Sequence, residues 1–166
     1  MSPTRWTSQI RTLRSVHGNY PILLKTLPSC DSDKAPGLLK SLQKPTTIYM
    51  LVMMKTLLST TDILHRYLQK ADLDMAKALQ HKDAVIQTLT EMRCAGVADQ
   101  IYAEAAEIMM ANNIAQPRPG SKRVPKRKKM DDYYTTTSVG QKEEITSADM
   151  MRTRLYYPII DRMTVK

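Results

Sequence analysis

The chain has 166 residues and a mass of 18.9 kDa, which suits one ordinary domain and excludes two full-sized ones. Its net charge is +9, but residues 116–130 hold seven basic and no acidic residues, which leaves 18 basic against 16 acidic residues elsewhere. The excess positive charge is therefore local. No uninterrupted apolar run approaches the ~18 residues of a membrane span, and the start MSPTRW lacks the apolar stretch of a signal peptide, so we expect a soluble, intracellular protein without a membrane partner.

The apolar residues have an unusual composition, with 12 Met, 8 Tyr, one Trp and no Phe. Met is flexible and fills gaps without fixing one packing, so this composition predicts an aliphatic, soft core. Cys30 and Cys94 lie 64 positions apart, which excludes a CxxC site and a disulfide framework. We expect both to be free thiols.

Apolar spacing predicts short helices at the start of the chain. A first helix is expected from about residue 7 to Gly18, because four residues recur at the 3.6-residue period of one helical face. These are Trp6, Ile10, Leu13 and His17. Asn19 is expected to cap a second helix that ends at Pro28, and a third, short helix is expected to end at Pro45.

Residues 47–69 form the strongest periodic segment and predict a long central helix. Its apolar stripe consists of Ile48, Leu51, Met54, Leu57, Leu58, Thr61, Leu64 and Leu68. Asp72 is the expected cap of the next helix, and Gly96 its expected end, because glycine favours the position after a helix. A further helix is expected over residues 97–113.

Residues 116–146 contain Pro, Gly and dense charge but almost no aliphatic residue, so they predict a long disordered basic loop. Ser147 is expected to cap a last helix, and Pro158 is expected to interrupt the segment after it. The sequence thus predicts an all-α, irregular helical bundle divided into a bundle (1–115), a flexible basic linker (116–146) and a C-terminal segment (147–166). No convincing strand or internal repeat is present.

The sequence contains no motif that signals catalysis, a cofactor or a small-molecule substrate. Neither a nucleophile elbow, nor a zinc-hydrolase helix, nor a phosphate-binding glycine loop occurs. His17, His65 and His81 have no Cys, Asp or Glu at ligand spacing on the same face, so we predict no metal site.

The sharpest local feature is a run of six cations within eight residues. Its members are Lys122, Arg123, Lys126, Arg127, Lys128 and Lys129. Three interpretations stay open: a nuclear-import signal, a phosphate-binding segment, or a solvated loop without a partner. Tyr133 and Tyr134 lie close behind the run and offer rings on which bases can stack.

Methionines on two of the expected helices allow either core packing or an adaptable groove for a protein partner. They are Met50, Met53 and Met54 on the central helix, and Met109 and Met110 on the later one. Core packing is the commoner use of Met at helical spacing.

Several segments resemble hAT-superfamily transposases and their domesticated zinc-finger MYM-type and TTF-type-associated relatives. The resemblance rests on PTRWTS at residues 3–8, the segment Pro21–Leu27, KAPGLLKSL, the stretch LLSTTDILHRYLQKADLDMAKALQHKDAVIQTLTEMR, RPGSKRV and LYYPIIDRM. Together they cover nearly the whole chain.

The resemblance implies the helical insertion domain of a protein with a ribonuclease-H-like core. In the family, three acidic residues bind two divalent ions and cleave DNA; the resemblance places all three outside this chain. It also implies that Arg5 and Trp6 lie close to DNA, where Trp6 either stacks on a base or simply packs in the fold.

We therefore expect a nuclear, non-catalytic, transposon-derived helical protein that needs no cofactor and keeps some affinity for DNA. One alternative is a nuclear helical scaffold for protein partners, in which the basic run serves only import. The other is a truncated gene product without independent activity.

Overall fold

The computed structural model describes residues 5–116 and 147–165, and it confirms the all-α class. Within those two ranges there is no strand. The expected basic loop and most of the expected linker lie outside the described residues. The elements are α1 (Arg5–Gly18), α2 (Tyr20–Thr26), η1 (Leu27–Ser29), α3 (Ala35–Leu42), α4 (Pro45–Leu68), α5 (Met75–Met92), α6 (Ala95–Ala111), α7 (Ser147–Met151), η2 (Arg152–Tyr156) and α8 (Tyr157–Thr164).

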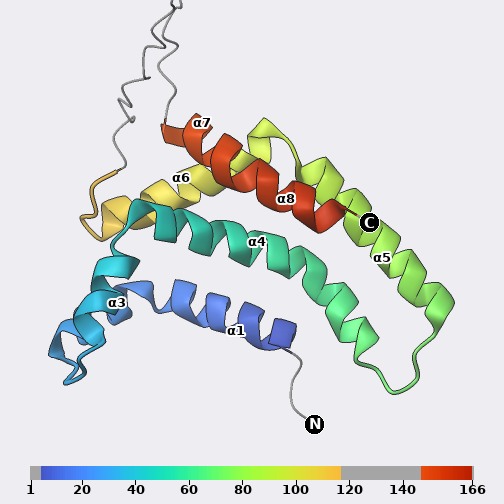
Figure 1. Cartoon of the computed structure of the whole chain (residues 1–166), viewed down its shortest axis with the longest axis horizontal. Helices are drawn as coiled ribbons and strands as arrows, with labels where there is room; N and C mark the ends of the chain where they lie inside the picture. Colours follow the sequence, from blue (N-terminus) through green and yellow to red (C-terminus); the bar gives the residue numbers. More distant parts are fainter. Residues whose placement is uncertain (1–4, 117–146, 166) are drawn as a thin grey trace, which may run out of the picture.

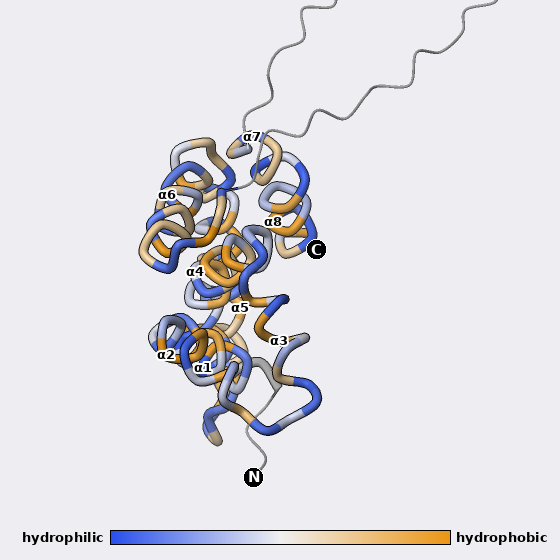
Figure 2. The backbone as a smooth tube through the Cα atoms, turned by 90° about the vertical axis from the view of Figure 1, so that its left-hand side faces the viewer, coloured by the Kyte–Doolittle hydropathy of each residue, from blue (hydrophilic) through white to orange (hydrophobic). Residues whose placement is uncertain are grey.

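α4 runs through the middle of the molecule, with α1 along one side and α5, α6 and α8 on the other (Figure 1). Seen from the side, α1 and α2 form one layer, α4 the next, and α6 and α8 an outer layer (Figure 2). The apolar stretches of the outer helices turn toward α4 in this view. A helix that has neighbours on several sides must be apolar around much of its circumference, which is why α4 has the longest apolar pattern in the chain.

The core gathers residues from helices on both sides of the undescribed segment. Its fully buried side chains include Ile48, Val52, Met53 and Leu57 of α4, Leu89 of α5, Met109 of α6, and Tyr156 and Ile160 of the C-terminal helices. Tyr20, Tyr49 and Tyr156 are the largest of these fully buried side chains. The buried hydrophobic residues are mainly aliphatic, as expected, and three tyrosine rings add the largest side chains among them.

Two expected helix boundaries are wrong, and one expected cap makes no capping hydrogen bond. Asp74, not Asp72, caps α5: its carboxylate accepts hydrogen bonds from the backbone N–H groups of Ala76 (2.9 Å) and Lys77 (3.3 Å). Gly96 does not end a helix but lies in the first turn of α6. Asn19 precedes α2 as predicted, yet its side chain donates back to the carbonyl of Ser15 at 2.9 Å and makes no capping bond.

The C-terminal segment is helical from Ser147 to Thr164, so Pro158 does not interrupt it as expected. Proline has no N–H and clashes with the carbonyl four residues earlier in a regular α-helix. Here the turn before Pro158 is widened into the π-helical η2 (Arg152–Tyr156), and Pro158 falls in the first turn of α8. The local widening lets the chain continue through the proline.

Among the described residues, α4 alone is long and apolar enough to cross a membrane by length and composition. From the lack of an uninterrupted apolar run, the sequence predicted no membrane span. Small polar residues such as Thr56 and Ser59 interrupt the apolar runs of α4 but lower its mean hydropathy only slightly. Half of its most apolar window is buried inside the structure. The core helix of a folded domain passes the same test.

Candidate functional site

The residues predicted from the sequence to bind DNA lie largely outside the described residues. Arg5 and Trp6 are the first two residues of α1, and their side chains are not described. The six cations of the run at 122–129 all lie in the undescribed segment. α1 begins on the lower side of the view in Figure 1, whereas residues 116 and 147 meet that segment at the upper left. The described part therefore does not bring Arg5 and Trp6 together with the ends of that segment.

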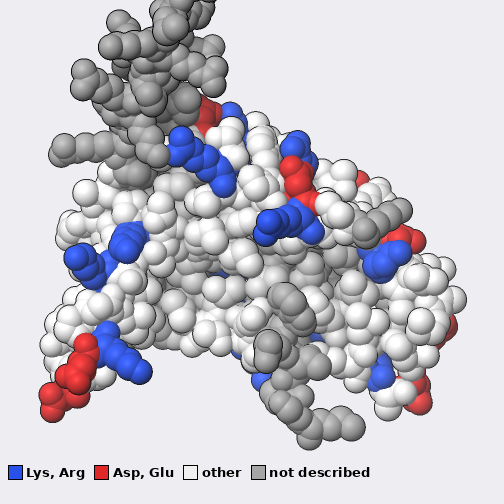
Figure 3. Space-filling view, viewed as in Figure 1, with Lys and Arg blue, Asp and Glu red and all other residues white. Residues whose placement is uncertain are grey.

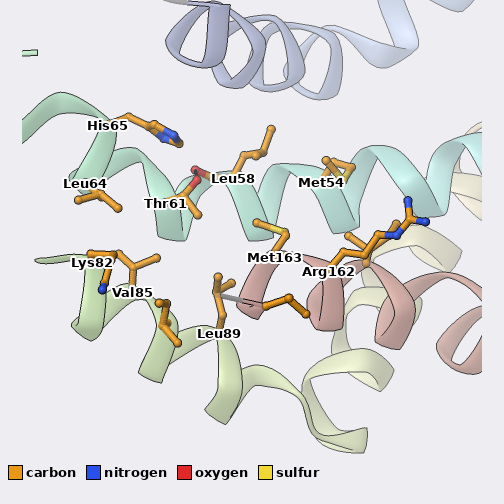
Figure 4. Close-up of a pocket in the computed structure, with 13 residues that line it drawn as sticks. Met54, Leu58, Thr61, Leu64, His65, Lys82, Val85, Leu89, Arg162 and Met163 are labelled. Atoms are coloured by element: carbon orange, nitrogen blue, oxygen red, sulfur yellow. Dashed lines mark hydrogen bonds between the residues drawn. The ribbon is translucent and has the colours of Figure 1, made fainter. Parts of the chain in front are cut away.

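A groove of about 960 Å³ lies between α4, α5 and α8 and is called here the α4/α5/α8 groove. Side chains from all three helices point into it (Figure 4). Nine of its lining side chains are apolar. They are Met54, Leu58, Leu64, Val85, Ile86, Leu89, Ile159, Met163 and Val165, accompanied by Thr61, His65, Lys82 and Arg162.

The charged side chains of the α4/α5/α8 groove are all basic. Lys82 of α5 and Arg162 of α8 line it, together with the imidazole of His65 on α4, and no Asp or Glu does so among the described residues. The ammonium of Lys82 lies 3.2 Å from the carboxylate of Asp83. Arg162 is exposed and has no carboxylate within 4.0 Å in the described part of the chain. The groove thus combines an apolar floor with a positive rim.

A bidentate ion pair holds α8 against the end of α5 and so shapes this groove. Arg93 donates to Asp161 through Nε (2.5 Å) and through a terminal nitrogen (3.0 Å). Its guanidinium also lies over the ring of Tyr157, 4.7 Å from the centroid. The hydrogen bonds from Arg93 and its positive charge hold the pKa of Asp161 below its ordinary value. The pair therefore links the C-terminal end of α5 to α8.

A second polar cluster fastens α1 and α6 to α4 on another side of the molecule. Lys55 of α4 donates to Glu104 of α6 at 2.6 Å, and His17 of α1 lies 3.0 Å from the same carboxylate. Burial alone raises the pKa of Glu104, but the hydrogen bond and charge of Lys55, with His17 beside them, outweigh it and lower the pKa. The cluster is an ion pair between helices.

A buried carboxylate lies on the face of α4 that is turned toward α1. The side chain of Asp62 is only 5% exposed and accepts a hydrogen bond from Arg66 at 2.6 Å, while Arg14 of α1 lies 3.6 Å away. Arg14 also donates to the hydroxyl of Ser59 at 3.3 Å. A buried charge of this kind requires partners, so Asp62 fixes α1 on α4.

The resolved pKa shifts all move groups away from neutral pH. Burial raises the pKa of Tyr156 to about 12 and raises those of Tyr20 and Tyr49, and the acidic side chains that shift do so downward. The hydroxyl of Tyr49 is buried without a hydrogen-bond partner among the described residues. A general acid or base works best with a pKa near the operating pH, and none of these shifts produces one.

No group of three or more His, Cys, Asp or Glu that could hold a metal lies together in the described part of the chain. Cys30 and Cys94 are free, as predicted, and both are exposed. On the face drawn in Figure 3, Lys and Arg lie singly or beside carboxylates, with uncharged surface between them. The described surface on this face holds no concentrated positive patch.

The comparisons with known proteins give no relative for this chain. No family model, no curated protein and no solved structure matches it. The resemblance to hAT-superfamily transposases therefore stays a prediction that rests on the quoted segments alone.

Sequence reasoning missed the α4/α5/α8 groove. The predicted methionine groove is not formed as a unit: Met53 and Met109 are buried in the core, and of the five candidates only Met54 lines the groove. Met110 is exposed elsewhere. Lys82 and Arg162 have no sequence signal that links them, because they meet only when α8 packs on α5. The one available signal was a predicted apolar stripe on α4 longer than a single neighbour can cover.

Proposed function

We propose that this chain is a non-catalytic, helical nucleic-acid-binding protein whose basic run at residues 122–129 contacts phosphates. The observation that carries the proposal is the concentration of charge. Six cations lie within eight residues, whereas the rest of the chain is almost neutral. Each lysine or arginine that neutralises a phosphate releases a condensed counterion, which makes such binding strong at low salt.

The ion pairs of the described residues support the proposal that the basic run, rather than the helices, contacts phosphates. Seven of its cationic side chains have a carboxylate within 4.0 Å, so little of their charge is left for a polyanion. They are Arg14, Lys55, Arg66, Lys77, Lys82, Arg93 and Arg152. The resemblance to hAT-superfamily transposases points the same way and adds Arg5 and Trp6 as candidate contacts. It also favours the nucleus as the site of action.

Charge neutralisation at two places tests the proposal. In the first variant, Lys126, Arg127, Lys128 and Lys129 are each replaced by Gln. The matched control replaces Lys25, Lys34, Lys40 and Lys44 by Gln, which are exposed and have no carboxylate within 4.0 Å among the described residues. We expect the first variant to lose binding to duplex DNA at low salt, and the control to keep most of it. Equal losses in both variants contradict the proposal.

The absence of catalysis is tested separately. The argument for it is that the chain presents no pKa shift toward neutral pH among its described residues and no hydrolytic motif in its sequence. We expect no cleavage of supercoiled DNA above a buffer control in the presence of Mg²⁺ or Mn²⁺. Cleavage that requires the intact protein would refute the non-catalytic part of the proposal.

The α4/α5/α8 groove favours a second candidate function, an interaction module for protein partners. Ligand and peptide sites are commonly concave and mostly apolar, with a few polar groups that set the orientation. In this case the basic run serves import or is solvated, and DNA does not bind even at low salt.

A further inference from the structure

We propose that the α4/α5/α8 groove binds an amphipathic helix of a protein partner, and that this helix carries Asp or Glu on both flanks of its apolar face. The inference rests on the interaction-module candidate and names the chemistry of its partner. It does not depend on nucleic-acid binding. Three properties of the groove carry it: its length, its lining and the sign of its charge.

The length of the groove matches a short helix. The α4 residues that line it extend from Met54 to His65, a separation of eleven residues. At the rise of an α-helix this is about 16 Å, or about three turns. An occupant of three turns presents apolar residues at positions i, i+3 or i+4, and i+7 to such a groove.

The lining of the groove suits a helix better than a bilayer or a flat surface. Leu64 of α4 points toward Val85 of α5, and Met163 of α8 borders the same space (Figure 4). The groove is concave, whereas proteins that lie on membranes insert protruding apolar side chains into the lipid. Met54 and Met163 are flexible and polarizable, so they adapt to the side chains of an incoming helix.

The charge of the rim selects the partner. Lys82 and Arg162 lie on the two helices that form one side of the groove, His65 lies on the opposite helix, and no described acidic side chain lines the space between. Arg162 in particular is exposed without a carboxylate within 4.0 Å among the described residues. A helix with acidic flanks supplies a counter-charge for Arg162 and adds favourable charge near Lys82, which already has Asp83 at 3.2 Å, while a basic helix meets repulsion.

Three synthetic peptides of about fourteen residues test this inference in fluorescence polarisation, since that length gives nearly four turns. The first has leucines on one face and Glu on both flanks. The second replaces every Glu by Lys, and the third scrambles the order of the first so that no apolar face forms. We expect the Glu peptide to bind full-length protein about tenfold or more tighter than either other peptide, as charge complementarity and an apolar face both require.

Variants of the protein assign the binding to the groove. The double variant Lys82→Glu and Arg162→Glu is expected to weaken the Glu peptide about tenfold and to strengthen the Lys peptide, because the rim changes sign. The control double variant Lys25→Glu and Lys40→Glu carries the same charge change outside the groove. Because salt screens charges that lie far from the groove, we expect its affinity for the Glu peptide to stay within about twofold of the wild type.

An apolar variant and its control complete the test. Met163→Glu places a charge in the groove and is expected to abolish binding of the Glu peptide, whereas Ile22→Glu, at an exposed position of α2, is not. Circular dichroism shows whether each variant keeps its helices; if Met163→Glu unfolds, the rim variants decide alone.

Each other outcome overturns the inference in a recognisable way. Equal binding of the Glu and Lys peptides leaves an interaction module but overturns the acidic partner. Absence of binding by all three peptides overturns both. A dimer in sedimentation that Met163→Glu converts to a monomer makes a second copy of the chain the occupant. The variant with Gln at 126–129 is expected to bind the Glu peptide like the wild type, which separates this result from the test of DNA binding.

Discussion

The hydroxyl of Tyr156 donates a hydrogen bond of 2.7 Å to the backbone carbonyl of Met92, 64 residues earlier in the chain. Tyr156 is fully buried at the end of η2, and Met92 is the last residue of α5. The carbonyls at the end of a helix have no partner within that helix, and this one accepts both the backbone N–H of Cys94 (2.7 Å) and the hydroxyl of Tyr156. This bond therefore joins the C-terminal helices to the bundle formed by the first part of the chain.

Replacing Tyr156 by Phe tests this connection. The ring still fills its place, but the carbonyl of Met92 keeps only the backbone N–H of Cys94 as a donor, and we expect the free energy of unfolding to fall by about 0.5–1.5 kcal/mol. Chemical denaturation measures the change. Tyr157→Phe is the matched control, because its hydroxyl makes no hydrogen bond within the described part of the chain and its ring stays beside Arg93. Equal stability of the two variants contradicts the assigned bond.

A comparison of two aspartates tests the start of α5. Asp74→Ala removes the acceptor for two backbone N–H groups, and we expect a loss of about 1 kcal/mol in the free energy of unfolding. Asp72→Ala changes the same charge two residues earlier, where the structure shows no capping bond, and we expect almost no effect. A larger loss for Asp72→Ala shows that the helix begins earlier than in the structure.

Acid stability tests the pair between Lys55 and Glu104. The pKa of Glu104 is lower in the folded chain than its ordinary value of 4.5, so the folded state favours the ionised carboxylate. Its contribution is present above that value and is lost as the pH falls through the folded pKa. Because the side chain of Glu104 is 40% exposed, solvent screening limits the effect to about 1 kcal/mol or less.

The measurement is the free energy of unfolding between about pH 3 and pH 7 for Glu104→Gln and for the wild type, over the range in which a carboxylate titrates. We expect the variant to be less stable than the wild type above pH 4.5 and the difference to shrink at lower pH. Glu107→Gln, on the exposed face of α6, serves as the control and is expected to leave the pH dependence unchanged. A difference that persists undiminished in acid points to packing and contradicts the ionic account.

The long helices could be predicted from the sequence because their signals are local. The stripe from Ile48 to Leu68 repeats at the helical period, and the structure has α4 over Pro45–Leu68. Pro45 was expected to end the third helix; α3 ends at Leu42, and Pro45 opens α4, where its missing N–H costs nothing. Capping was harder: Asp72 and Asp74 are both acceptable caps, and the choice depends on where the chain turns between α4 and α5.

The candidate groove could not be predicted, because it depends on contacts between distant segments. Met54, Leu58 and Leu64 belong to the same stripe as Ile48 and Leu57, yet only the latter two are fully buried. The difference arises from the position of α8, which packs on α5 and leaves part of the stripe uncovered. Hydropathy alone assigns all of these residues to the core.

The salt dependence of DNA binding tests the central claim most directly. For duplex DNA, the slope of log K against log salt concentration is about −0.9 for each neutralised phosphate. We therefore predict that replacing Lys126, Arg127, Lys128 and Lys129 by Gln makes the slope shallower by about 3 to 4, and that the control at Lys25, Lys34, Lys40 and Lys44 changes it by less than about 1. An unchanged slope in the first variant, or no binding by the wild type at low salt, contradicts the claim that the basic run contacts phosphates.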